Sequence, residues 1–123
     1  MRSILVVDDH NGMRYCVSEM IESMGIECVA VESAEKAIAM LMERDFDIVI
    51  SDYHLEGGMN GDKFLASVRI NKPHVSTILM SGLLQTDSNY PMFKEHYALP
   101  KPFSPKELQK AILSVLKPME WAS

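Results

Sequence analysis

Short apolar runs that stop abruptly at polar residues recur along the chain, and this pattern constrains the fold more than any other feature. The run at 4–7 ends at Asp8, the run at 48–50 is followed closely by Asp52, and the run at 78–80 ends at Ser81. Continuous apolar runs of this length are typical of strands that are buried on both faces, as in parallel sheets. The sequence therefore predicts parallel strands whose ends carry polar side chains to the surface.

Segments with helical spacing of apolar residues separate these runs. Residues 13–24 place apolar side chains on one helical face, and Gly25 is the expected C-cap. A second helix is expected after Ser33 and a third near 62–70. The last helix has the clearest signal, because residues 104–107 supply an N-cap serine, a proline at the first helical position and the glutamate of a capping box. The inner face of the second helix is expected to comprise Ala34, Ala37, Ile38 and Leu41.

Two shorter strands are expected at 28–31 and 97–99, so strands and helices alternate along the chain. This alternation predicts parallel βαβ units and a sheet covered by helices on both faces. Such sheets bind ligands in a crevice at the carboxyl ends of the strands. The polar residues expected to meet at this edge are Asp8, Asp9, Asp52, Ser81 and Lys101.

The chain has 123 residues, of which 47% are hydrophobic, so a single domain spanning 1–123 is expected. Its net charge of -5 argues against direct binding to nucleic acid or to an anionic membrane surface. No apolar run is long enough to cross a membrane and no secretory signal is evident, which predicts a soluble, cytoplasmic protein. Cys16 and Cys28 lie in separate apolar patterns and are expected to be reduced core residues.

Three carboxylates brought together would repel one another unless a cation neutralised them, and hard oxygen ligands suit Mg²⁺. Asp8, Asp9 and Asp52 are therefore the candidate metal ligands. A carboxylate can also attack a phosphoryl group to form an acyl phosphate when cationic donors offset the charge. Asp52 is the candidate nucleophile, with Lys101 as the cation and the Ser81 hydroxyl as a hydrogen-bond donor to the phosphoryl oxygens.

The four histidines share no helical face and no metal-ligand spacing. They are expected to be surface or loop residues rather than catalytic groups. They are His10, His54, His74 and His96.

Over nearly its whole length the chain resembles a response-regulator receiver domain. The matching segments are 4–9 (ILVVDD), 49–52 (VISD), 80–82 (MSG) and 101–103 (KPF). The resemblance implies a flavodoxin-like doubly wound sheet of five parallel strands in the order 2-1-3-4-5. It also implies a cis peptide bond before Pro102.

In that family Asp8 and Asp9 would be the acidic pair, Asp52 the phosphoacceptor, Ser81 the switch hydroxyl and Lys101 the invariant lysine. The main-chain carbonyl of His54 would be a further Mg²⁺ ligand. The implied function is a phosphorylation-dependent switch in a two-component phosphorelay, with a histidine kinase or phosphotransfer protein as donor and an effector protein or domain downstream. Such a domain assists its own phosphorylation and dephosphorylation but is not a turnover enzyme.

The chain departs from the family pattern in the loop after the acceptor, where Glu56 replaces the usual proline and the loop is one residue longer. Residues 82–100 should hold a fourth helix, but their composition predicts a short or irregular one. Ala98 occupies the position of the usual switch aromatic, and strand alternation should send Tyr97 to the opposite face. Signalling could then use another group, with Tyr90 and Phe93 as candidates.

Two other functions are compatible with parts of the pattern. A pseudo-receiver would bind a partner without phosphorylation, which the substituted aromatic position at Ala98 favours and the intact acidic set opposes. A haloacid-dehalogenase-like phosphatase also uses an aspartate nucleophile and Mg²⁺. The resemblance to that family would require an Asp-x-Asp motif at the first strand, but the residue two positions after Asp8 is His10. Flavodoxin itself fits less well, because an acidic first loop would repel a flavin phosphate.

Overall fold

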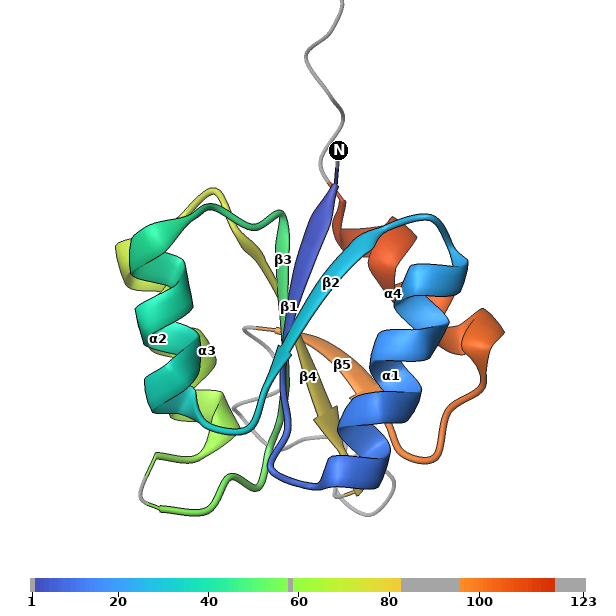
Figure 1. Cartoon of the computed structure of the whole chain (residues 1–123), viewed down its shortest axis with the longest axis horizontal. Coiled ribbons are helices and arrows are strands. Elements are labelled where there is room, and N and C mark those ends of the chain that lie inside the picture. Colours follow the sequence, from blue (N-terminus) through green and yellow to red (C-terminus); the bar gives the residue numbers. More distant parts are fainter. Residues whose placement is uncertain (1, 58, 83–95, 117–123) are drawn as a thin grey trace, which may run out of the picture.

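A computed structural model describes residues 2–57, 59–82 and 96–116 and shows a five-stranded sheet with helices on both faces (Figure 1). All strand pairs are parallel and the order is β2-β1-β3-β4-β5, which confirms the predicted topology. The elements, in chain order, are β1 (Ser3–Val7), α1 (Asn11–Ser23), β2 (Glu27–Val31), α2 (Ala34–Glu43), β3 (Ile48–Asp52), α3 (Gly61–Asn71), β4 (Ser76–Ser81), β5 (Tyr97–Pro100) and α4 (Pro105–Val115).

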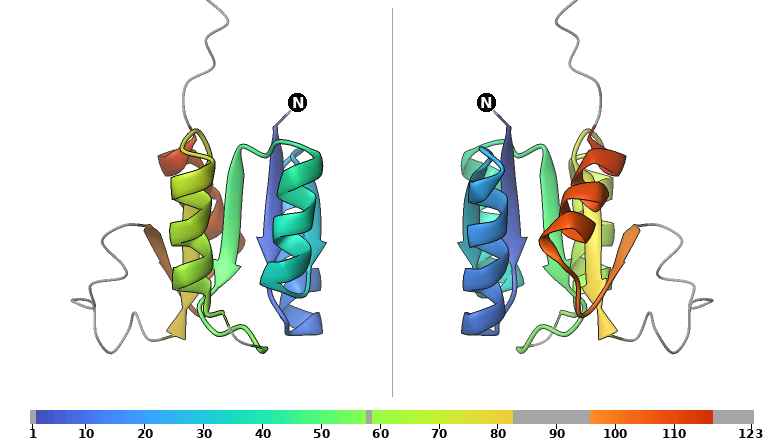
Figure 2. Two further views of the ribbon diagram at one scale, coloured as in Figure 1. Left: turned by 90° about the vertical axis from the view of Figure 1, so that its left-hand side faces the viewer. Right: turned by 90° about the vertical axis from the view of Figure 1, so that its right-hand side faces the viewer.

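Strand side chains alternate between the two faces of the sheet, so each face has its own apolar core. Leu5, Val49 and Leu79 pack with residues of α2 and α3, whereas Ile50 and Ile78 pack with residues of α1 and α4. Figure 2 shows the two helical layers, with α2 and α3 nearest the viewer in the left panel and α1 and α4 in the right panel. Burial on both faces explains why the three central strands are uninterrupted apolar runs in the sequence.

Local capping chemistry sets where the helices begin. Ser33 accepts a hydrogen bond from the Lys36 N–H at the start of α2. Ser104 and Glu107 form the predicted capping box at the start of α4. Gly25 follows α1 with φ +79°, a left-handed conformation that glycine adopts without steric cost.

β5 is an edge strand, and it pairs only with β4 in the described sheet. Ala98 packs with the core under α2 and α3, and Tyr97 packs with the core under α1 and α4, so the predicted separation of these two side chains is confirmed. Pro100 ends the strand, where a missing N–H donor is tolerated. The expected irregular fourth helix, with Tyr90 and Phe93, lies outside the described residues.

Two burial predictions are wrong. Cys16 is exposed, because the apolar face of α1 is carried by neighbours such as Val17, about 100° around the helix from Cys16. Ile38 remains 37% exposed at the rim of α2. His96 lies in the loop before β5, as expected of a surface or loop residue, but it is buried at 6% exposure with its ring within hydrogen-bonding distance of Thr77. The other expected core cysteine, Cys28, is half-buried, and burial raises the pKa of its thiol.

Among the described helices, none has both the length and the apolar character needed to span a bilayer.

Candidate functional site

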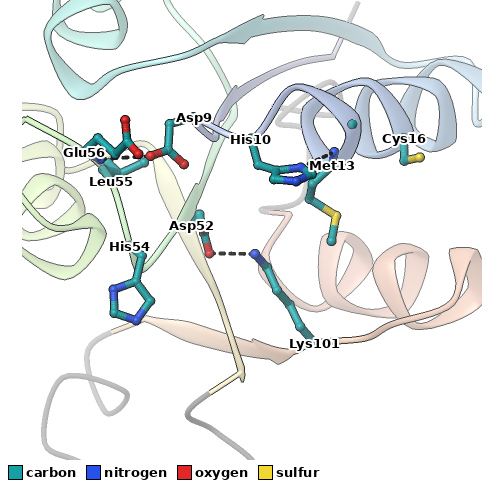
Figure 3. Close-up of a pocket in the computed structure, with 10 residues that line it drawn as sticks. Asp9, His10, Met13, Cys16, Asp52, His54, Leu55, Glu56 and Lys101 are labelled. Atoms are coloured by element: carbon teal, nitrogen blue, oxygen red, sulfur yellow. Dashed lines mark hydrogen bonds and ion pairs between the residues drawn. The ribbon is translucent and has the colours of Figure 1, made fainter.

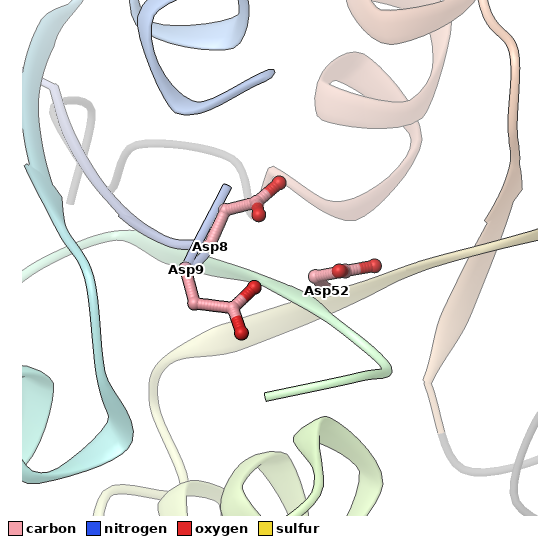
Figure 4. A group of neighbouring side chains, drawn as sticks. All are labelled: Asp8, Asp9 and Asp52. Carbon is pink, nitrogen blue, oxygen red and sulfur yellow. The ribbon is translucent and has the colours of Figure 1, made fainter. Parts of the chain in front are cut away.

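The sequence-predicted acidic residues meet at the carboxyl edge of the sheet, at its topological switch point. β2 lies on one side of β1 and β3 on the other, so the chain reverses its winding direction between β1 and β3. Asp8 and Asp9 follow β1 directly, and Asp52 is the last residue of β3. Each of the three offers a carboxylate oxygen, and these atoms lie within 4.8 Å of one another (Figure 4).

Asp8 is the most deeply buried of the three carboxylates, with 0% exposure. Its Oδ1 accepts a hydrogen bond from the His10 N–H at 2.9 Å, but its Oδ2 is buried without a hydrogen-bond partner. Burial raises the pKa of Asp8, and the negative charges of Asp52 and Asp9 raise it further. The His10 N–H and the Lys101 ammonium act in the opposite direction and do not outweigh burial.

Asp52 is paired with Lys101 across the site. The Lys101 Nζ lies 2.8 Å from the Asp52 Oδ1, and both side chains are largely buried, at 24% and 11% exposure (Figure 3). Lys101 follows β5, which places its ammonium at the same sheet edge as the ends of β1 and β3. The structure thus brings together the predicted nucleophile and the predicted cation.

Ser81 and His54 are placed near the site, but their predicted roles remain predictions. Ser81 is 1% exposed at the end of β4, and its main-chain carbonyl accepts a hydrogen bond from the Lys101 N–H at 3.2 Å. His54 lies in the loop after β3 and lines the same hollow as Asp9 and Asp52.

A hollow of about 670 Å³ opens over the acidic cluster. Figure 3 shows Asp9, Asp52 and Lys101 around it, with Met13 and Cys16 contributed by α1. The hollow therefore gives an incoming molecule a route to the Asp52 carboxylate between α1 and the loop after β3.

Sequence reasoning missed three residues that shape the site. His10 caps α1 by accepting the Met13 N–H on its Nδ1, and its own N–H holds Asp8. The Glu56 N–H donates to the Asp9 Oδ2 at 3.0 Å. Gly61 passes so close to Asp52 that an added Cβ would lie 1.9 Å from the Asp52 carbonyl oxygen. The glycine run after Glu56 was a signal for a tight approach, but no sequence signal indicated any of the three hydrogen bonds made by His10 and Glu56.

The residues present fit a bound Mg²⁺. The donor set consists of carboxylate oxygens, which are the ligands that Mg²⁺ prefers, and the Asp8 Oδ2 is a buried oxygen without a hydrogen-bond partner. A divalent cation would also offset the mutual repulsion of the three carboxylates.

These features define a class: doubly wound α/β proteins with an acidic cluster and a lysine at the switch point. The sequence model of the response regulator receiver domain matches residues 4–113, and the chain belongs to that family.

Sequence relatives are regulatory proteins of greater length. The chain is 34% identical over 107 residues to the response regulator protein FleR of Pseudomonas aeruginosa, covering 85% of this chain and 22% of FleR. It is 26% identical over 121 residues to the phosphate regulon transcriptional regulatory protein PhoB of the same species, covering 94% of this chain and 52% of PhoB. The chain thus spans about a fifth to a half of the length of these relatives.

Solved structures of response regulators align with 94% of this chain. The chemotaxis response regulator CheY4 of Vibrio cholerae aligns with a TM-score of 0.84 and 26% identity over 94% of this chain and 99% of that protein. The response regulator protein TrrA of Thermotoga maritima, solved in complex with Mg(2+)-BeF, aligns with a TM-score of 0.83 and 26% identity over 94% of this chain and 100% of TrrA.

Proposed function

We propose that this chain is a phosphorylation-dependent switch that accepts a phosphoryl group on Asp52. The observation that carries the proposal is the 2.8 Å pairing of the Lys101 ammonium with the Asp52 carboxylate beside two further carboxylates. Asp9, Asp52 and Lys101 thus line one hollow, so a metal ligand, a nucleophilic oxygen and a cation for the phosphoryl oxygens are open to the same incoming molecule.

In the proposed step an Asp52 carboxylate oxygen attacks the phosphorus of a phosphohistidine. A P–O bond forms to Asp52 while the P–N bond to the donor imidazole breaks, and the electron pair stays on the imidazole nitrogen. The product is an acyl phosphate, and Lys101 exchanges its contact with the free carboxylate for one with a phosphoryl oxygen. Ser81, at the end of β4, is the proposed donor to another phosphoryl oxygen.

Asp8, Asp9 and Asp52 are the proposed Mg²⁺ ligands, with the main-chain carbonyl of His54 as a further one. When bound, Mg²⁺ would supply positive charge to the phosphoryl oxygens as negative charge develops on them. The carboxylates themselves orient the site, and Asp8 brings to it an oxygen that has no other partner.

The proposed partners are a histidine kinase or phosphotransfer protein upstream and an effector protein or domain downstream. The chain would be a stoichiometric acceptor whose acyl phosphate is later hydrolysed by water, so it is not a turnover enzyme. A new dianion at Asp52 would bias the neighbouring elements through charge and hydrogen bonding.

The direct test is to incubate the chain with Mg²⁺ and acetyl phosphate and to measure the intact mass. We expect an added phosphoryl mass on the wild-type chain and on Asp45→Asn, an exposed aspartate outside the site, and none on Asp52→Asn. Adduct formation that survives Asp52→Asn, or no adduct with any phosphodonor, would contradict the proposal.

A second candidate function is partner binding without phosphorylation. It is favoured by Ala98, which occupies the usual aromatic position and faces the core under α2 and α3, while Tyr97 faces the other core. Partner affinity that stays the same after acetyl phosphate treatment would favour this candidate over the switch.

A further inference from the structure

We infer that Glu56 is a positioning residue of the metal site, and that its main-chain N–H, rather than its carboxylate, sets the orientation of Asp9 toward Mg²⁺. The inference rests on the proposed function, since it concerns the same metal site. It assigns a role to the position at which this chain departs from the proline usual in its family.

The contact itself is a hydrogen bond of 3.0 Å from the Glu56 N–H to the Asp9 Oδ2. Asp9 is only half-buried, so without such a bond its side chain would sample several rotamers. A carboxylate offers about four lone-pair sites on two oxygens, so accepting one N–H leaves the rest available to a metal ion. Hydrogen bonds of this kind to a metal-binding carboxylate fix its direction before the ion arrives.

The loop that carries Glu56 is anchored on both sides, which allows it to hold Asp9 in place. Leu55 is 7% exposed and belongs to the core under α2 and α3. At the other end the Gly61 N–H donates to the Tyr53 carbonyl at 2.7 Å. The N–H of Glu56 therefore projects from a segment whose position is set by packing.

Glu56 is exposed and is one of the residues that line the hollow. Its charge acts on Mg²⁺ through solvent, where screening makes it weak. Main-chain and side-chain effects can be separated because most substitutions keep the N–H, whereas proline removes it.

Gly57 follows Glu56 with φ +87°. Proline is common immediately before a glycine of positive φ in type II turns, so Glu56→Pro is the substitution that removes the donor with the least disturbance. Glu56→Gln removes the charge alone, and Glu56→Ala removes the whole side chain, and both keep the N–H.

The experiment measures Mg²⁺ affinity by isothermal titration calorimetry for the wild type and the three variants. We expect Glu56→Pro to weaken binding about 10-fold or more, as is typical for loss of a partner behind a metal ligand. Glu56→Ala and Glu56→Gln should change the affinity less than about threefold. Equal affinities for the proline and alanine variants would overturn the inference, and so would a full loss in Glu56→Gln.

A second measurement does not involve the metal. Urea unfolding in EDTA should show Glu56→Pro less stable than Glu56→Ala in the wild-type background, and this difference should disappear when Asp9→Ala is present, because the acceptor is gone. A difference that persists in the Asp9→Ala background would assign the proline effect to the loop alone and overturn the inference.

Failure of the inference and failure of the proposed function give different results. If the wild-type chain binds Mg²⁺ and is phosphorylated, and Glu56→Pro behaves like Glu56→Ala, the role of the Glu56 N–H is contradicted and the proposed function stands. If the wild-type chain binds no Mg²⁺, both the role of the Glu56 N–H and the proposed function are contradicted.

Discussion

Each carboxylate at the site has a different neighbour, and this difference sets what each can do. Asp52 faces the Lys101 ammonium, Asp9 accepts an N–H from the loop after β3, and Asp8 has one oxygen held by His10 and one without a hydrogen-bond partner. Asp8 is buried and incompletely satisfied, so burial disfavours its charged form in the absence of a cation and raises its pKa.

Asp8→Asn should make the metal-free protein more stable at neutral pH. The raised pKa of Asp8 means that the folded state binds its proton more tightly than the unfolded state does. The contribution of protonated Asp8 to the free energy of unfolding is therefore fully present below the ordinary aspartate pKa of about 3.9. This contribution is lost as the pH rises through the raised pKa of the folded state. Removing the buried charge should add about 1–3 kcal/mol in EDTA, measured by urea unfolding at pH 7.

The same substitution should abolish tight Mg²⁺ binding, so its stabilising effect should shrink or reverse when Mg²⁺ is added. Asp45→Asn, at an exposed carboxylate, is the control and should change little in either condition. A destabilised Asp8→Asn in EDTA would show that the buried carboxylate has a partner that offsets its burial.

Gly61→Ala should destabilise the fold strongly. The added Cβ would lie 1.9 Å from the Asp52 carbonyl oxygen, so the backbone of either β3 or α3 would have to move. Overpacking of this kind costs about 1–3 kcal/mol or more, measured by urea unfolding. Gly82→Ala is the matched control, because its Cβ would meet nothing within 4 Å, and it should change stability by less than about 0.5 kcal/mol.

At the scale of elements, α4 depends on its first turn. The Ser104 Oγ accepts the Glu107 N–H at 3.2 Å, and the Glu107 carboxylate accepts the Ser104 N–H at 2.9 Å. This reciprocal pair satisfies two N–H groups that would otherwise have no helical partner.

Ser104→Ala should therefore cost about 1 kcal/mol of folding stability, measured by thermal or urea unfolding. Ser114→Ala is the control within the same helix, since the Ser114 Oγ donates only to the Lys110 carbonyl on an exposed face. Equal effects at the two positions would mean that the cap contributes no more than an ordinary surface serine.

Elements were predictable from the sequence where the signal is local. The apolar run at 48–50 and the capping serine Ser104 each specify their element without reference to the rest of the chain. Burial at helix rims was less predictable. Cys16 and Ile38 each lie about 100° around their helix from a fully buried neighbour, so only tertiary packing decides whether they are buried or exposed.

At the scale of the whole molecule, the site exists only when distant strands are paired. β1 is hydrogen-bonded to β3, β3 to β4 and β4 to β5, and this pairing brings Asp8, Asp52 and Lys101 together from across the sequence. The sequence predicted this convergence because parallel strands share a carboxyl edge. The Glu56 contact with that edge was not predictable, since it depends on the path of a loop.

Because the site forms only in the folded state, Mg²⁺ should stabilise the whole domain by mass action. At a free concentration 100 times the dissociation constant the gain should be about 2.7 kcal/mol, seen as a rise in unfolding temperature that grows with Mg²⁺ concentration. Asp9→Ala should reduce this rise, and a rise of equal size in that variant would place the ion elsewhere.

The two cysteines differ in exposure, so one of them can be labelled selectively. Cys16 is exposed and is one of the residues that line the hollow, whereas Cys28 is half-buried and burial raises the pKa of its thiol, which disfavours the reactive thiolate. A maleimide fluorophore added at neutral pH should therefore attach to Cys16 first, without any engineered cysteine. A change in the emission of this dye on addition of Mg²⁺ and acetyl phosphate would then report an event in the hollow that Cys16 lines.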